Sequence, residues 1–223
     1  MKKLILIFPL FLILGGCSQV GETFNQKGVA AFHQNRFEEA ALDFHWAAFF
    51  QNQDAVDLND EGYAFYLAKD FDKAQKALQK AQELTKDPKL TFQIQLNLAL
   101  LYCDPAARLD RRAGKDWLPR GIGLFQNLLG SDPRNAELWM RLGFADFQNS
   151  NPGGGFMELE KACSFAAPQY VALYTADPVG GSLLILRQVH AFYIKIRYFK
   201  KADEVQKKIS ALEKRKRKFP TSS

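Results

Sequence analysis

The chain has 223 residues, of which 47% are hydrophobic and 24% charged, and this is the composition of a globular protein. Its formal net charge of +6 is unevenly distributed, because residues 195–218 alone carry eleven Lys or Arg and only three Asp or Glu. The basic character therefore belongs to the C-terminal segment, which argues against a chain that is basic throughout. Beyond residue 16, no apolar run approaches membrane-spanning length.

The N-terminal segment has the pattern of a bacterial secretory signal peptide. Lys2 and Lys3 precede an apolar run from Leu4 to Leu14, and two glycines then precede Cys17. The order Leu-Gly-Gly-Cys resembles the lipobox of bacterial lipoproteins. That resemblance implies that residues 1–16 are a signal peptide, that Cys17 becomes the acylated first residue, and that residues 17–20 form a short lipidated linker. The alternative is an uncleaved apolar helix that ends in a chance cysteine.

The residue after Cys17 indicates where a lipidated chain would reside. In enterobacterial lipoproteins, a residue other than Asp at this position usually means export to the outer membrane, and here it is Ser18. The resemblance therefore implies a lipid anchor at the periplasmic face of the outer membrane. In a Gram-positive cell the same signal would place the chain on the outer face of the plasma membrane.

An internal repeat organises the rest of the chain. Four pairs of identical residues share a spacing of 34: Gly28 and Gly62, Phe37 and Phe71, Ala40 and Ala74, Ala47 and Ala81. A period of 34 and this pattern of small and aromatic residues resemble the tetratricopeptide repeat (TPR), a pair of antiparallel helices. The resemblance implies an all-α fold, a right-handed superhelical solenoid of about five helix pairs.

The expected TPR domain covers residues 21–216. We expect repeats at about 21–54, 55–88, 92–135, 136–169 and 183–216, with an insertion between the helices of the third. This insertion, residues 104–116, is expected to be a surface loop because long inserts in repeat proteins map to one face. A linker at 170–182 and a basic, disordered tail at 217–223 complete the expected organisation.

Small residues recur where the two helices of a repeat should touch. We expect Gly28, Gly62, Ala99 and Gly143 to permit close approach, while Phe44, Leu78, Phe125 and Leu159 fill the space opposite. One helix pair cannot bury its own apolar face, so neighbouring repeats must stack.

Residues that would support catalysis or metal binding are scarce. The histidines His33, His45 and His190 do not stand at metal-ligand spacing, and Cys103 and Cys163 have no CxxC partner. Gly153-Gly154-Gly155 lacks the Lys-Ser/Thr of a phosphate loop and is interpreted as an inter-helix turn. We therefore expect no catalytic residue, no metal and no cofactor.

The family resemblance also implies a concave groove, lined by the first helix of each repeat, that binds a peptide. The positions expected to face this groove are Asn25, Val29, Phe32, Asn59, Tyr63, Tyr66, Leu100, Met140, Phe144 and Phe147. An aromatic groove would suit an apolar segment of another protein. The alternative is that several of these aromatic residues are simply core.

The last basic run suggests a second contact. Lys214, Arg215, Lys216, Arg217 and Lys218 would suit the anionic phosphates of an envelope surface, and a solvated helix end is the alternative. Export makes nucleic acid an unsuitable partner. The function that the sequence favours is a lipid-anchored TPR scaffold or adaptor that binds a peptide segment of another envelope protein. The alternative function is an envelope enzyme or enzyme regulator with an unrecognised site.

Overall fold

The computed structural model describes residues 7–109, 116–171 and 177–218, and over these ranges it contains twelve helices and no strand. The expectation of an all-α fold is therefore confirmed. Within the described residues, no helix is both long enough and apolar enough to cross a membrane. The chain divides into two compact units, residues 1–117 and residues 118–223.

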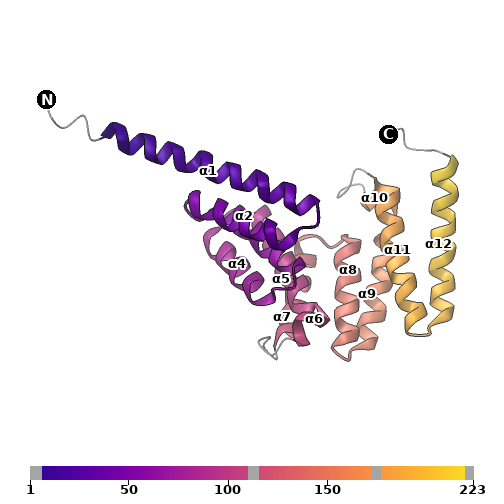
Figure 1. Cartoon of the computed structure of the whole chain (residues 1–223). Coiled ribbons are helices and arrows are strands. Elements are labelled where there is room, and N and C mark those ends of the chain that lie inside the picture. Colours follow the sequence, from indigo (N-terminus) through magenta and orange to yellow (C-terminus); the bar gives the residue numbers. More distant parts are fainter. Residues whose placement is uncertain (1–6, 110–115, 172–176, 219–223) are drawn as a thin grey trace. The chain divides into compact units, whose positions relative to one another are not determined.

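Unit 1 consists of successive antiparallel helices (Figure 1). The first pair is α1 (Ile7–His33) with α2 (Phe37–Phe50), and the second is α3 (Ala55–Leu67) with α4 (Phe71–Leu84). Helix α5 (Pro88–Cys103) packs on α4 and is followed by the short α6 (Pro105–Leu109). Figure 1 shows α2 lying along the C-terminal half of α1.

Unit 2 contains most of α7 (Trp117–Ser131) and two further helix pairs. One pair is α8 (Ala136–Gln148) with α9 (Pro152–Phe165). After the short α10 (Pro168–Val171), the other pair is α11 (Pro178–Lys195) with α12 (Phe199–Lys218). The two members of each pair pack against each other along their lengths, as the repeat pattern predicts.

Four turns between paired helices share one backbone geometry. Each contains a non-glycine residue in the left-handed region, with φ between 59° and 67°: Asn35, Lys69, Ser150 and Arg197. In each turn the next residue donates its N–H to the carbonyl five residues earlier, as in Asn151 to Asp146 at 2.9 Å. This bond is typical of a Schellman motif, which ends the first helix and reverses the chain.

Polar side chains fix the start of several helices. Side chains that accept hydrogen bonds from backbone N–H groups of the first helical turn include Asp54, Asp70, Asp87, Asn135, Asn151 and Asp177. These N–H groups have no partner within the helix, so each cap stabilises its helix by about 1 kcal/mol.

The expected close approaches occur within three helix pairs. A Cβ added to Gly28 would lie 2.8 Å from the ring of Phe44, and one added to Gly62 would lie 2.6 Å from Leu78 Cγ. Gly143 stands in the same relationship to Leu159. In each pair the two residues are 16 positions apart, so the repeat places the large side chain of the second helix against the glycine of the first. The prediction for these three glycines is confirmed.

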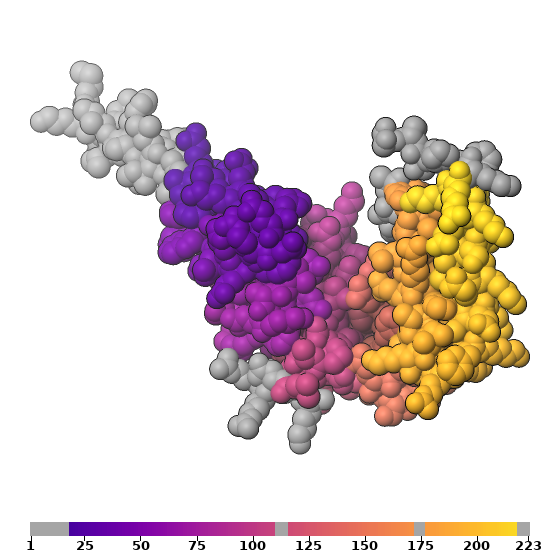
Figure 2. All heavy atoms as spheres, turned by 45° about the vertical axis from the view of Figure 1, so that its right-hand side comes forward, coloured from indigo at the N-terminus to yellow at the C-terminus, as the bar shows by residue number. Residues whose placement is uncertain are grey.

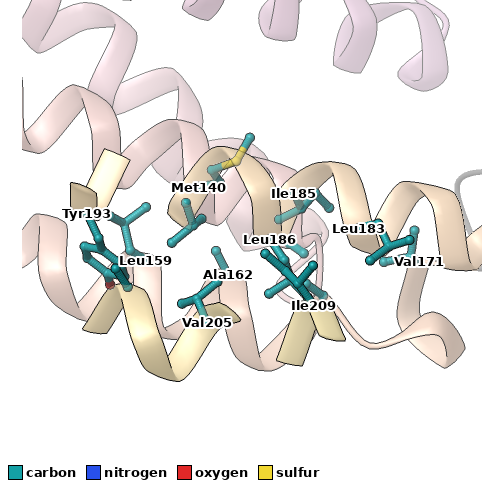
Figure 3. Close-up of a cluster of buried hydrophobic side chains, with 14 residues drawn as sticks. Met140, Leu159, Ala162, Val171, Leu183, Ile185, Leu186, Tyr193, Val205 and Ile209 are labelled. Carbon is teal, nitrogen blue, oxygen red and sulfur yellow. The ribbon is translucent and has the colours of Figure 1, made fainter. Parts of the chain in front are cut away.

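The core of unit 2 is built by side chains from α8, α9, α11 and α12. Figure 3 shows Leu159, Leu186, Tyr193 and Val205 converging between these helices. All four are nearly or fully buried. Neither pair in this unit could bury so much apolar surface alone, so the pairs depend on each other for stability.

The structure differs from the sequence prediction at three boundaries. Residues 17–20, expected to form a linker, are part of the continuous helix α1. The expected linker at 170–182 contains the end of α10 and the start of α11, which Asp177 caps. Helix α12 continues through Lys218, so the first residues of the expected tail are helical. The glycines and proline of residues 170–182 suggested a break in the helices, but Pro178 occupies the first turn of α11, where proline is tolerated.

Two smaller interpretations also need correction. The expected insertion loop begins with α6, where Ala107 is buried, while residues 110–115 lie outside the described residues. Gly153, Gly154 and Gly155 lie in the first turn of α9, so the inter-helix turn precedes them. Gly155 packs against α8, because a Cβ there would lie 2.5 Å from the Phe147 ring.

Candidate functional site

Cys17, the expected lipidation site, lies within α1, and its side chain is outside the described residues. It is four positions before Gly21, which packs closely on the end of α2. A Cβ on Gly21 would lie 2.5 Å from Gln51 Cγ and 3.3 Å from the carbonyl oxygen of Ala47. Acylation at Cys17 would therefore place the lipid close to the end of α2.

A pocket of about 290 Å³ lies where the first two repeats of unit 1 meet. It is lined by Val29, Phe32 and His33 of α1, Phe44 of α2, and Asp60 and Tyr63 of α3. Val29 is 40% exposed at its edge, so the pocket opens to solvent. A predominantly apolar wall with one acidic group is the usual construction of a site that takes an apolar side chain.

Aromatic rings continue from this pocket along the first helices of unit 1. The ring centroids of Phe32 and Tyr63 are 5.9 Å apart, and those of Tyr63 and Tyr66 are 6.1 Å apart. The Tyr66 hydroxyl donates to Asp104 Oδ2 at 3.1 Å. Three residues of the predicted groove, Phe32, Tyr63 and Tyr66, thus form one run, which we call the aromatic run.

Asp60 gives the pocket its polar group. Burial, together with the nearby carboxylates of Asp57 and Asp54, raises the pKa of this carboxyl to about 6. The hydrogen bond from Asn59 acts in the opposite direction and lowers the pKa. A cationic group from a bound segment would favour the ionised form of Asp60, so binding of such a group would release a proton below pH 6.

The two asparagines predicted for the groove connect neighbouring helices instead. Asn25 Nδ2 donates to Asp57 Oδ1 at 2.6 Å, which joins α1 to α3. Asn97 Nδ2 of α5 donates to Asn59 Oδ1 at 2.9 Å, which joins α5 to α3. Asn59 is only 5% exposed, so the assignment of this residue to an open groove is wrong. Its amide is needed to satisfy polar groups between packed helices.

The predicted groove positions of unit 2 are packed against its own helices. Met140 is 1% exposed and belongs to the core (Figure 3), so its assignment to the groove is wrong. Phe144 and Phe147 are half-buried, and each has its ring centroid 4.8 Å from that of Phe192 on α11. Packing of α11 against α8 covers these rings, and the interpretation of them as core residues is the one that the structure supports.

Sequence reasoning missed two acidic residues of α3, Asp60 in the pocket and Glu61 against α2. Glu61 is buried and its Oε1 lies 3.1 Å from His45 Nδ1 on α2. Burial raises the pKa of Glu61, while His45 lowers it. Asp60 precedes Tyr63 by three positions, which puts both on one helix face and could have indicated its place in the pocket.

The described residues contain no group of three His, Cys, Asp or Glu side chains that could hold a metal ion. Cys103 is buried on α5 in unit 1, and Cys163 is half-buried on α9 in unit 2. Burial raises the pKa of the Cys163 thiol to about 11, which keeps it protonated and unreactive near neutral pH.

The basic C-terminal run is partly engaged within unit 2. Lys216 Nζ lies 3.0 Å from Asp177 Oδ2, which joins the end of α12 to the start of α11. Lys214, Arg215 and Arg217 are exposed on α12, and the Lys218 side chain is outside the described residues. Three exposed cations close together on one helix are available to an anionic surface.

Comparisons with known proteins bear on the fold. Neither a protein-family model nor a curated protein matches the chain. Among solved structures, MamA 41-end from Desulfovibrio magneticus RS-1 is similar with a TM-score of 0.58 and 15% identity, over 87% of this chain and 95% of that one. TTC0263, a thermophilic TPR protein in Thermus thermophilus, is similar with a TM-score of 0.54 and 16% identity, over 86% and 98%.

A crystal structure of MamA is also similar, with a TM-score of 0.53 and 15% identity over 65% of this chain and 77% of that one. These likenesses show that the fold is an all-α helical-repeat solenoid of the TPR type. The predicted fold class is therefore confirmed. At such identities, function has to be argued from the residues of this chain.

Proposed function

We propose that this protein is a lipid-anchored TPR scaffold of the bacterial cell envelope, without enzymatic activity, that binds a peptide segment of another envelope protein. Its place is the periplasmic face of the outer membrane, where acylated Cys17 holds it. The Leu-Gly-Gly-Cys order and Ser18 support this location, and the TPR fold supports the scaffold role.

The pocket at Phe32 and Tyr63 is the observation that carries the binding role. It lies between first helices of neighbouring repeats, opens to solvent and has apolar walls. Tyrosine and phenylalanine supply a large contact area and lose little rotamer entropy on binding. A volume of about 290 Å³ is near the lower end for ligand sites and is enough for one large side chain and its neighbours.

The partner segment follows from the chemistry of the pocket. An aliphatic or aromatic side chain would enter between Val29 and Tyr63, and a Lys or Arg beside it would meet Asp60. A charge-assisted hydrogen bond to Asp60 would be stronger than a neutral one. The segment is therefore an apolar anchor flanked by a basic residue, held along the aromatic run.

Site-directed photo-crosslinking in intact cells tests the groove. A photoreactive phenylalanine at Val29 should capture the partner, whereas the same probe at Val56 should not. Val56 is a matched control because it is exposed on α3 and does not line the pocket. Tyr63→Ala should weaken capture by at least about 1 kcal/mol, as an anchor residue does. Equal capture from both positions would contradict the groove.

Replacement of the anchor cysteine tests the location. Cys17→Ala should leave an unprocessed precursor or release the protein from the membrane fraction, while Cys163→Ala should fractionate as wild type. Mass spectrometry of the N-terminal peptide should find the lipid on Cys17. A mature, lipid-labelled Cys17→Ala protein would show that the anchor lies elsewhere.

A further inference from the structure

A group of four aromatic side chains, two exposed and two half-buried, lies on the first helix pair of unit 1, apart from the pocket. We call it the aromatic cluster, and its members are Phe24 of α1 and Trp46, Phe49 and Phe50 of α2. Trp46 is 46% exposed and Phe49 is 62% exposed. Figure 2 shows the surface of this helix pair in indigo. Large aromatic rings so exposed and so close together normally mark an interaction surface.

The rings of the cluster hold one another in place. Phe24 and Phe50 are stacked with centroids 5.8 Å apart, and Phe49 meets Phe50 edge-on at 5.4 Å. Trp46 contacts Phe49 at 5.9 Å. Exposed Leu42 and Val20 extend the apolar surface by one helical turn on each helix. The cluster is therefore a preformed apolar surface that needs little ordering on contact.

The position of the cluster in the chain indicates its partner. Gly21, between Val20 and Phe24, packs against the last turn of α2, and Cys17 is only four residues earlier. Four residues span about 6 Å as a helix and about 14 Å when fully extended. A lipid on Cys17 therefore brings the membrane surface within reach of the cluster.

The composition around the cluster fits a membrane interface. Residues 46–53, from Trp46 to the end of the turn, contain no Asp, Glu, Lys or Arg. The charged residues that flank it in the sequence are acidic Glu22, Asp43 and Asp54 and basic Lys27, whose Nζ lies 5.2 Å from the Phe24 ring centroid. Tryptophan and other aromatic rings favour the head-group level of a bilayer. Because the nearby charges do not sum to a basic surface, the contact must be apolar rather than electrostatic.

We propose that the aromatic cluster inserts into the interfacial layer of the phospholipid leaflet that holds the Cys17 lipid, and so orients unit 1 on the membrane. This inference rests on the lipid anchor of the proposed function. Phe24 and Phe32 are about 12 Å apart along α1, so the rings of the cluster can enter the interface while the peptide pocket stays in water. A single acyl-anchored residue leaves a protein free to swivel, and a second contact would fix its orientation.

Quenching of Trp46 fluorescence by brominated phospholipids tests this inference. The full chain with Trp117→Phe and Trp139→Phe leaves Trp46 as its one tryptophan. The lipidated protein, purified from cells, is reconstituted in vesicles of phosphatidylethanolamine with a minor fraction of phosphatidylglycerol. Bromine near the head-group end of the chains should quench Trp46 by at least about twofold relative to unbrominated lipid, because interfacial tryptophan lies at this depth. High salt should not reduce the quenching.

Two variants and one separate measurement make the result decisive. Phe49→Gln should roughly halve the quenching, while Met157→Gln should leave it unchanged because that equally exposed residue lies on α9. If Cys17 carries lipid and Trp46 is not quenched, the inference is wrong and the anchor stands. If mass spectrometry finds no lipid on Cys17, the anchor fails and the inference fails with it. A dimer in detergent with Trp46 shielded from lipid would overturn the inference and show that a second copy covers the cluster.

Discussion

Gly143 and Leu159 lie face to face across α8 and α9, and a Cβ added to Gly143 would be 2.9 Å from both Cγ and Cδ2 of Leu159. The same relationship, with the same spacing of 16, joins Gly28 to Phe44 and Gly62 to Leu78. The missing side chain on one helix is what allows the large side chain of its partner to be fully enclosed. This relationship is the structural reason for the repeated glycine.

Replacement of this glycine should destabilise the protein. Gly143→Ala would force Leu159 from its position, and overpacking of this kind costs about 1–3 kcal/mol. The carbonyl oxygen of Gly155, 3.1 Å from the added Cβ, leaves little room for relief. Urea unfolding followed by circular dichroism measures the change.

Gly123→Ala is the matched control for this substitution. Gly123 lies within α7, where an added Cβ meets no atom within 4 Å. Alanine should therefore stabilise this helix by about 0.5–1 kcal/mol, since it removes the entropic cost of glycine. Equal effects at both positions would show that close packing at Gly143 is unimportant.

The left-handed residue of the α8–α9 turn offers a stabilising change. Ser150 has φ of 59°, a conformation that costs a residue with a Cβ about 1–2 kcal/mol. Ser150→Gly should raise the free energy of unfolding by about 0.5–1 kcal/mol after the entropic cost of glycine is subtracted. Asn149→Gly, next to it with φ of −86°, should lower that free energy. A melting temperature that falls for Ser150→Gly would contradict the assignment of this turn.

Stability should decrease between about pH 4.5 and pH 8 because of a pair of acids in unit 2. Burial first, and then the charge of Asp146 and a hydrogen bond with it, raise the pKa of Glu158 to about 8. The folded state therefore binds a proton that the unfolded state releases near pH 4.5. The stabilisation is complete below that pH and is lost as the pH rises through the folded pKa.

Glu158→Gln should remove much of this pH dependence, because glutamine keeps the hydrogen bond and carries no proton to lose. Thermal unfolding at about pH 5, 6.5 and 8 would show a smaller decrease for the variant than for wild type. The raised pKa of Asp60 acts in the same direction, so some dependence should persist near pH 6. If the wild-type protein is more stable at pH 8 than at pH 5, the raised pKa of Glu158 is wrong.

Phe147 and Val29 should respond differently to replacement, although the sequence assigned both to one groove. Phe147 packs on Phe156 at 4.9 Å and on Phe192 at 4.8 Å, so Phe147→Ala should cost on the order of 2 kcal/mol of stability. Val29→Gln at the exposed pocket edge should change stability by less than about 0.5 kcal/mol. Binding of the partner to both variants, measured on folded protein, separates the roles. Unfolding of Val29→Gln would mean that Val29 belongs to the core.

Much of the fold is predictable from the sequence because the repeat is periodic. A spacing of 34 identifies the helix pair, and Gly28, Gly62 and Gly143 identify its close contacts, since only a missing side chain permits them. Element boundaries were less predictable. Pro178 and Gly180 suggested a linker. In the structure, the Asp177 side chain accepts a hydrogen bond from Gly180 N–H, and this cap makes the same residues the first turn of α11. A cap is a hydrogen bond, and whether it forms depends on the turn that precedes it.

The division between groove and core was decided by tertiary structure alone. Tyr63 and Phe147 are aromatic residues on first helices, and both fit the groove pattern equally well. Phe156 of α9 and Phe192 of α11 both pack against Phe147, whereas Tyr63 borders an open pocket. Exposure depends on which distant helix approaches a face, and a periodic sequence specifies the face without specifying its neighbour. The sequence by itself determined the repeat, the small-to-large contacts and the anchor pattern, and the tertiary structure decided which aromatic rings remain available to a partner.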